Sequence, residues 1–158
     1  MDVLARLDHA RREHDVLQHP FYQRWSAGEL RAGELSLYAD QYRHAVLALA
    51  EASARAAAQA GPEHRPGLER HAAEEADHVR LWDRFAAETR MRKAESAHAP
   101  ADPTAGAPLD QTAHCATAWT AGEDLLERLA VLYAIEASQP EISATKLEGL
   151  VHRYGYTP

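Results

Sequence analysis

The chain has 158 residues, enough to bury a core of its own, so a single domain is expected over residues 1–158. Its 17 Lys and Arg are outnumbered by 24 Asp and Glu, and no basic stripe follows the sequence, which argues against nucleic acid as a partner. The first residues carry charges every few positions and no apolar run could cross a membrane, so we expect a soluble, cytoplasmic protein with no membrane partner.

The order of residues predicts an all-α protein. Ala, Leu, Glu and Arg dominate, strand-like alternation is absent, and Gly or Pro interrupts the chain at helix-length intervals. The first helix is expected from Val3 to Trp25 with a break or kink at Pro20. The second is expected from about Glu34 to Ala60, where Gly61 and Pro62 follow.

Four further helices complete the predicted fold. The third is expected over Arg65–Lys93, and the Pro, Ala and Gly residues of Ala99–Pro108 predict a surface connection. The remaining three are expected over Gln111–Trp119, Glu123–Gln139 and Pro140–Gly155. The result is a bundle of six main helices joined mostly by short loops.

The third predicted helix carries titratable residues on its apolar side. Steps of three and four trace an apolar seam through Leu68, Ala72, Val79, Trp82 and Phe85 or Ala86. Glu75 lies inside this seam, and His71 and His78 flank it. One interpretation is structural: Glu75 pairs with an arginine such as Arg43 or Arg128, and the histidines form hydrogen bonds at the edge of the core. The other is that these side chains bind a metal.

The fifth predicted helix strengthens the metal interpretation. After Arg128 it is apolar almost all round, which predicts burial on most of its surface. Glu136 follows seven apolar residues, so its carboxylate needs a partner, a proton or a cation. Because Cys115 is the only cysteine, a bound metal would have nitrogen and oxygen ligands. Two buried glutamates, one with a histidine three residues on, resemble the ligands of carboxylate-bridged iron or manganese sites in helix bundles. The usual ferritin-like form has Glu-x-x-His twice, whereas Gln139 follows Glu136 at the matching offset, which argues against a ferritin-like protein.

Three segments resemble the heme-oxygenase-like superfamily, which includes thiaminase II proteins, the pyrroloquinoline quinone synthesis protein C and nonheme diiron oxidases. LQHPFYQRWSAGEL with LYADQYRHAV is similar to its first two helices, and EEADHVRLWDRFA to its third. IEASQPEISATKLEGLVHRYG resembles the helix pair that supplies a glutamate ligand and then a lysine in the CADD-like branch. The resemblance implies a heme-oxygenase-like helical bundle and is closest to that iron-containing redox branch.

This resemblance implies a set of metal ligands. Glu75 and Glu136 match the two carboxylate ligands, and His78 matches the histidine that follows the first glutamate. His71 is a further candidate ligand that matches no family position. The implied cofactor is two nonheme iron ions, with manganese as the alternative. The family completes its site with a His-x3-Asp-x2-His helix, so the natural chain is expected to continue past Pro158.

The same resemblance gives two candidate catalytic residues. Lys146 matches the lysine of the CADD-like branch, although a solvated helix lysine is the alternative interpretation. Tyr42 lies in the segment LYADQYRHAV and is the second candidate. The implied function is a diiron oxidase that activates dioxygen on a small amino-acid-derived or acyl substrate in biosynthesis. Its expected partners are that substrate and dioxygen, and a homodimer is one candidate assembly.

Other functions remain open at this point. A cofactorless oxidase like the quinone synthesis protein would use His and Arg side chains around an organic substrate. A noncatalytic binding module would present an apolar groove to a partner helix. A thiaminase-like hydrolase would need Cys115 as its nucleophile, but a lone cysteine in ATAHCATAW is also typical of a small core residue.

Overall fold

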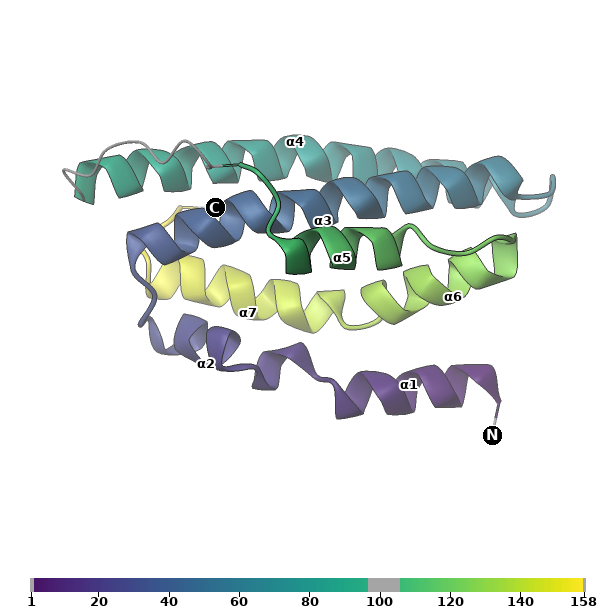
Figure 1. The fold of residues 1–158 in the computed structure, drawn as a ribbon, viewed down its shortest axis with the longest axis horizontal. Helices are drawn as coiled ribbons and strands as arrows, with labels where there is room; N and C mark the ends of the chain where they lie inside the picture. The colour runs from purple at the N-terminus through teal and green to yellow at the C-terminus, as the bar shows by residue number, and fades with distance from the viewer. Residues whose placement is uncertain (1, 97–105, 158) are drawn as a thin grey trace. The chain divides into compact units, whose positions relative to one another are not determined.

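The computed structural model describes residues 2–96 and 106–157, and every regular element in these ranges is a helix (Figure 1). The predicted all-α fold is confirmed. The expected connection over Ala99–Pro108 lies mostly outside the described residues. In chain order the elements are α1 (Val3–Glu13), the 3-10 turn η1 (Val16–Gln18), α2 (Pro20–Ala27), α3 (Ala32–Gln59), α4 (Arg65–Ser96), α5 (Asp110–Trp119), α6 (Leu125–Glu136) and α7 (Gln139–His152).

The first predicted helix is divided. A new helix begins at Pro20, where a break was expected, but α1 already ends at Glu13, which corrects its predicted extent. α1 ends at Glu13, and the Asp15 carboxylate then accepts a hydrogen bond from the Leu17 N–H at 3.0 Å, which starts η1. His19 Nδ1 accepts from the Phe21 N–H at 3.2 Å and caps α2. Pro20 therefore begins a helix, where its missing N–H costs nothing, and does not kink one.

The described helices group into two compact units. The first unit comprises Met1–Leu30 and Tyr133–Pro158, and the second comprises Arg31–Leu132. Helix α6 begins in the second unit and ends in the first. The single domain expected from chain length stays a prediction. None of the helices in the described ranges is both long and apolar enough to cross a membrane.

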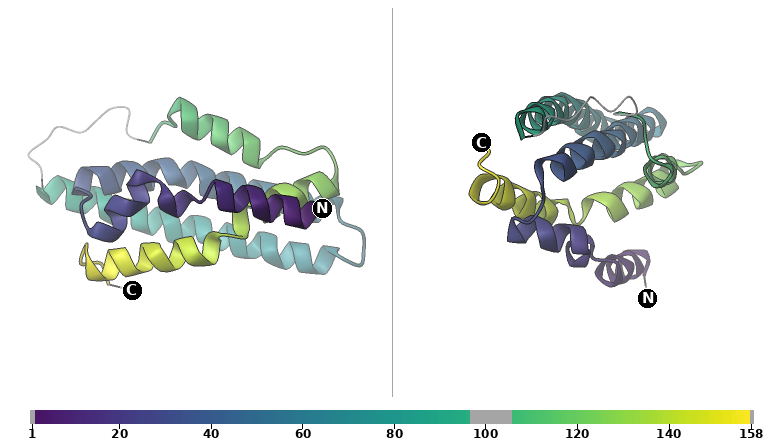
Figure 2. Two further views of the ribbon diagram at one scale, coloured as in Figure 1. Left: turned by 90° about the horizontal axis from the view of Figure 1, so that it is seen from below. Right: turned by 60° about the vertical axis from the view of Figure 1, so that its left-hand side comes forward.

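The second unit is built on the long helices α3 and α4, which lie side by side in both views of Figure 2, with α5 against α3. Small residues dominate the buried side of α3, among them Ala39, Ala48, Ala52 and Ala56. Side chains without bulk let neighbouring helix backbones approach closely. Dispersion contacts along the whole length of two long helices therefore supply most of the packing in this unit.

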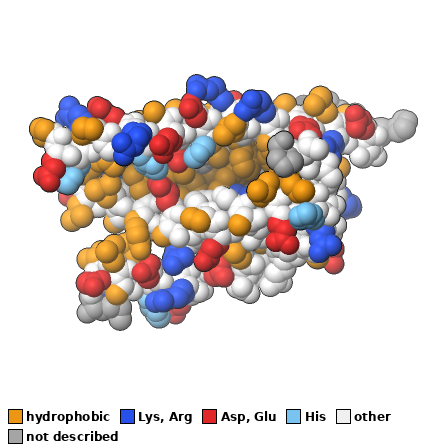
Figure 3. Space-filling view, turned by 180° about the vertical axis from the view of Figure 1, so that it is seen from behind, with side chains coloured by type: hydrophobic (Ala, Val, Ile, Leu, Met, Phe, Trp, Pro, Cys, Tyr) orange, Lys and Arg blue, Asp and Glu red, His pale blue; other side chains and the backbone are white. Residues whose placement is uncertain are grey.

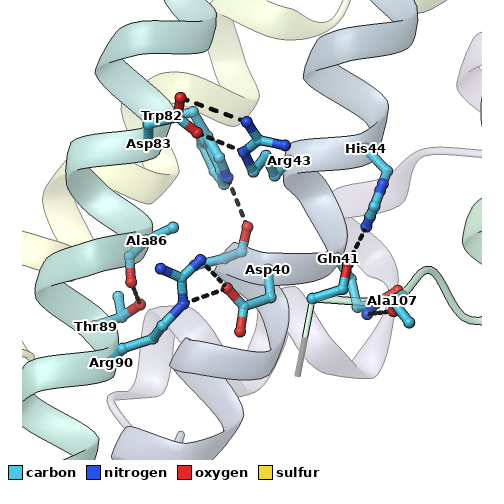
Figure 4. A network of polar contacts seen from close by, with 12 residues as sticks. Asp40, Gln41, Arg43, His44, Trp82, Asp83, Ala86, Thr89, Arg90 and Ala107 are labelled. Carbon is cyan, nitrogen blue, oxygen red and sulfur yellow. Dashed lines mark hydrogen bonds and ion pairs between the residues drawn. The ribbon is translucent and has the colours of Figure 1, made fainter. Parts of the chain in front are cut away.

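Polar contacts fasten α3 to α4 along one stretch (Figure 4). Arg90 donates from Nε to the Asp40 carboxylate at 2.9 Å, and the Trp82 indole N–H donates to the Ala39 carbonyl at 2.7 Å. Arg43 and Asp83 form an ion pair at 2.5 Å. This part of the interface is held by several independent side-chain bonds.

The outer surface of α4 is rich in charges of both signs. On the face shown in Figure 3, acidic and basic side chains alternate along the upper edge, where α4 lies. Several of them pair within the helix, as Arg80 does with Asp77 and Arg92 with Glu88. Exposed pairs at this spacing contribute a few tenths of a kcal/mol each. Their arrangement offers no continuous basic stripe on this face.

In the first unit, α1 is tied to the end of α6 and α2 packs on α7. The Tyr133 hydroxyl donates to the Asp8 carboxylate at 2.9 Å, and this bond raises the pKa of Tyr133. Arg11 donates to the Ala137 carbonyl and to the Ser138 hydroxyl at 3.3–3.5 Å. A guanidinium at this position also faces the negative end of the α6 dipole.

Helix α6 is covered on most of its surface, as predicted: after Arg128 every residue but Ala134 is half-buried or buried. Leu132 is its one buried residue, and Leu126 is 77% exposed. An apolar residue of a helix is buried only where a neighbouring element lies against it. Here one face of α6 stays at the surface, and the most buried helix of the described chain is α3.

Candidate functional site

Glu75 and His78 form the centre of the candidate site on α4. Glu75 is 7% exposed, and its carboxylate oxygen lies 3.1 Å from His78 Nδ1, one turn further along the helix. The predicted seam around it is confirmed. Its members are half-buried or buried, namely Leu68, Ala72, Val79, Trp82, Phe85 and Ala86. The side chain of His78 is 56% exposed, so this pair reaches from the packed side of α4 toward its surface.

The two arginines that could have neutralised Glu75 bind other groups. Arg43 pairs with Asp83, which raises the pKa of the Arg43 guanidinium, and Arg128 donates to the Gln59 side chain at 2.9 Å. These bonds give neither arginine to Glu75, but the structural interpretation stays open, because His78 lies within hydrogen-bond distance of the Glu75 carboxylate at the edge of the seam. The imidazole of His78 lies beside the buried carboxylate. His71 lies half-buried four residues earlier on the same helix.

The donor chemistry of this pair fits a hard or borderline metal ion. One carboxylate and one imidazole are ligands that iron and manganese accept. Within residues 2–96 and 106–157, no three His, Cys, Asp or Glu side chains are grouped closely enough to share an ion. Glu136 closes α6 in the first unit, whereas Glu75 and His78 belong to the second. Convergence of these three residues on one metal stays a prediction.

Lys146 is half-buried on α7. Burial lowers the pKa of its ammonium from 10.5 to about 8. This does not fit the alternative of a solvated helix lysine, because a charge exposed to water keeps its ordinary pKa. An amine with this pKa is neutral in a small fraction of molecules at neutral pH, which makes it available as a base or nucleophile.

Trp25 contacts the backbone of the same turn of α7. The Trp25 side chain is fully buried, and its indole N–H donates to the Lys146 carbonyl at 3.3 Å. A Cβ at Gly149 would lie closer than 3.0 Å to the indole, so only glycine leaves room for it. Sequence reasoning missed this contact. The signal was Gly149 itself, because a glycine inside a predicted helix and away from any turn often marks a close packing contact.

Tyr42 belongs to an aromatic cluster between α3 and α4. Its ring centroid lies 4.7 Å from that of Trp82 and 5.4 Å from that of Tyr38, and Phe85 lies 5.2 Å from Trp82. Such offset pairs each stabilise packing by roughly 1 kcal/mol beyond their buried area. The apolar seam predicted Trp82 and Phe85 on the packed side of α4, but it did not indicate that they meet tyrosines of α3.

Cys115 is half-buried on α5, and burial raises the pKa of its thiol. A nucleophilic cysteine needs the opposite shift, because the thiolate is the reactive form. The thiaminase-like hydrolase is therefore disfavoured, and Cys115 fits the alternative of a small packing residue.

A shallow groove between α3 and α5 lies elsewhere in the second unit. It has a volume of about 270 Å³, and its polar lining includes His44, Glu51 and Thr117. None of the candidate ligands or catalytic residues lines it. The groove therefore adds nothing to the site on α4.

The helical fold, with a Glu-x-x-His pair on α4 whose glutamate is buried and a half-buried lysine on α7, fits the class of heme-oxygenase-like helical proteins. The chain is 30% identical to the 4-aminobenzoate synthases of Chlamydia muridarum (strain MoPn / Nigg) and Chlamydia trachomatis serovar D, matching 99% of this chain and 67% and 68% of theirs. The chain belongs to the 4-aminobenzoate synthase family.

A 4-aminobenzoate synthase of Nitrosomonas europaea is 29% identical over 89% of this chain and 61% of its own length. The chain thus spans about two thirds of the length of these relatives. No protein-family model matches it.

Proposed function

We propose that this protein is an oxygen-activating biosynthetic enzyme that forms an aminobenzoate, with nonheme iron held by Glu75, His78 and Glu136. The name of its relatives supports the product. The observation that carries the metal assignment is the Glu75 carboxylate, which is 7% exposed and contacts an imidazole in place of an arginine. A buried carboxylate without a cation is costly, and a metal would remove that cost.

The protein side chains have distinct roles in this proposal. Glu75 and Glu136 would hold the two irons by their carboxylates, with His78 as a nitrogen ligand and His71 as a further candidate; manganese is the alternative metal. Bound iron would supply the redox chemistry on dioxygen. The surrounding apolar seam would keep water from the reacting atoms.

Lys146 and Tyr42 are the proposed catalytic residues. With a pKa of about 8, the Lys146 amine can accept a proton from, or add to, a small amino-acid-derived or acyl substrate near neutral pH. Tyr42 would offer a phenol held by its contacts with Tyr38 and Trp82. Both roles rest on these local environments and on the family resemblance.

Metal binding is tested by Fe(II) titration and metal analysis of the wild type beside Glu75→Ala and Glu136→Ala. Both variants should lose iron while their circular dichroism stays helical. Glu74→Ala is the matched control. Glu74 is the exposed neighbour of Glu75, so its replacement should leave iron binding unchanged. Unchanged iron in Glu75→Ala, or no iron in the wild type, would contradict the proposal and favour a cofactorless oxidase.

The product is tested in cells that cannot make 4-aminobenzoate. Expression of the wild type should restore growth in air without added 4-aminobenzoate, and mass spectrometry should detect the compound. Lys146→Ala and Glu75→Ala should fail to restore growth, whereas Glu74→Ala should succeed. Growth restored equally by all four proteins would show that these residues are not catalytic.

A further inference from the structure

We propose that Trp25 is a positioning residue for Lys146, acting through the indole N–H that meets the Lys146 carbonyl beside Gly149. The inference rests on the proposed function only in giving Lys146 a catalytic role. The contact itself lies wholly within the first unit, where α2 packs on α7. Two features of this contact support the proposal.

The first feature is the fit of the indole against α7. Trp25 is 0% exposed, and its Nε1 and Cδ1 atoms occupy the space that a side chain at position 149 would fill. An indole fitted against bare backbone fixes the distance between two helices more closely than flexible side chains can. Gly149 lies one turn after Lys146. This close approach therefore sets the distance between α2 and the turn of α7 that contains Lys146.

The second feature is the set of bonds that hold Trp25 itself. Its ring meets that of Tyr154 edge-on at 5.7 Å, and the Tyr154 hydroxyl donates to the Trp25 carbonyl at 3.0 Å. The same hydroxyl accepts from the Leu30 N–H at 3.3 Å. Tyr154 follows α7 directly, so the segment that Trp25 contacts also holds Trp25 in place. Trp25 cannot shift without moving both Tyr154 and the backbone of α7 at Gly149.

The consequence for Lys146 follows from its half-buried position. If the indole bond is lost, this turn of α7 can move away from α2 and water can reach the ammonium. Water stabilises the charged form, so the pKa of Lys146 should rise toward its ordinary value. A tryptophan that merely filled space would leave the pKa unchanged when replaced by another large aromatic residue.

The test is the pH profile of amine acylation by acetic anhydride, read by mass spectrometry. The chain has two lysines, so Lys93 serves as an internal reference for Lys146. In the wild type the Lys146 profile should have its midpoint near 8. In Trp25→Phe, which keeps an aromatic ring but lacks the N–H, the midpoint should rise by at least about half a unit, a threefold change in neutral amine.

A matched control is available in the second unit. Trp82→Phe removes an indole N–H bond to a backbone carbonyl of the same kind, at Ala39, and should leave the Lys146 midpoint where it is. If Trp25→Phe does not fold, as judged by circular dichroism, Tyr154→Phe provides the milder test. It removes the hydroxyl bonds to the Trp25 carbonyl and the Leu30 N–H but keeps the ring and the indole bond, and it should shift the midpoint in the same direction by less.

The outcomes separate this inference from the proposed function. Equal Lys146 midpoints in the wild type and in folded Trp25→Phe, or in Tyr154→Phe if that variant is needed, would overturn the positioning role. An equal shift in Trp82→Phe would also overturn it, because the effect would then be nonspecific. A shift confined to the Trp25 or Tyr154 variant, in a protein that binds no iron and forms no aminobenzoate, would support the positioning of Lys146 and refute the function.

Discussion

The helix pairs α3–α4 and α2–α7 are held together in different ways. Between α3 and α4, bonds at Asp40, Arg43 and Ala39 are spread along two long helices, each made by a separate side chain. Between α2 and α7, the indole of Trp25 meets bare backbone at Gly149. A distributed interface tolerates the loss of one contact, whereas a point contact does not. The candidate catalytic residue Lys146 lies at the point contact, between α2 and α7.

The largest expected effect is that of Gly149→Ala. The added methyl group would overlap the indole of Trp25, so one of the helices must shift, and we expect a loss of about 3 kcal/mol in the free energy of unfolding. Gly67→Ala on α4 is the control, since nothing lies within 4 Å of its added carbon. Denaturant unfolding should show Gly67→Ala as neutral or stabilising. Comparable losses in both variants would refute the point contact.

A smaller effect is expected for the Asp40–Arg90 pair of the distributed interface. The Asp40 side chain is 8% exposed and that of Arg90 is 50% exposed. Arg90→Ala leaves a buried carboxylate unpaired and should cost about 2 kcal/mol, whereas in Asp40→Asn the arginine can turn to water and the cost should be about 1 kcal/mol. Urea unfolding at neutral pH measures both. A larger loss in Asp40→Asn would contradict this order.

Lys146→Met should stabilise the protein at pH 7 by roughly 1–2 kcal/mol. Burial lowers the Lys146 pKa from 10.5 to about 8, so the unfolded chain binds more protons between these pH values and wild-type stability rises with pH there. Below pH 8 the ammonium is charged in both states and its burial penalty is present in full. The gain should therefore shrink above pH 8 and disappear near pH 10.5. Thermal unfolding across pH, with Lys93→Met as the control, checks this.

The smallest effect is expected for Gln41→Ala at the start of α5. The Gln41 side chain donates to the Ala107 carbonyl at 2.9 Å and accepts from the Leu109 N–H and the Thr112 hydroxyl at 2.8–2.9 Å. These exposed bonds should contribute about 1 kcal/mol or less in total. The visible result should be faster amide hydrogen exchange at Leu109, with no change in exchange within α4.

Local patterns predicted the long helices well. Gly61 and Pro62 mark the end of α3, and steps of three and four placed Glu75 in a buried seam, because a helix repeats its surface every 3.6 residues. The break at Pro20 was predicted, but the end of α1 at Glu13 and the turn η1 were not, because Asp15 and His19 cap new helices with side chains, which the apolar pattern does not register.

Contacts between distant segments were not predictable in the same way. The seven apolar residues before Glu136 indicated burial, and most of them are covered, but the exposure of Leu126 at the start of α6 depends on which elements lie beside it. The environment of Lys146 likewise depends on a residue more than a hundred positions earlier in the chain. Periodicity describes one helix at a time, so it cannot identify its neighbours.

The space shared by Trp25 and Gly149 also constrains the order in which this sequence can change. Any larger residue at position 149 first requires a smaller one at position 25, because the indole already fills that volume. Shrinking position 25 first leaves a cavity that a later side chain at 149 can fill. Each position thus decides which substitutions the other can accept, and a path that begins at position 149 passes through a destabilised protein.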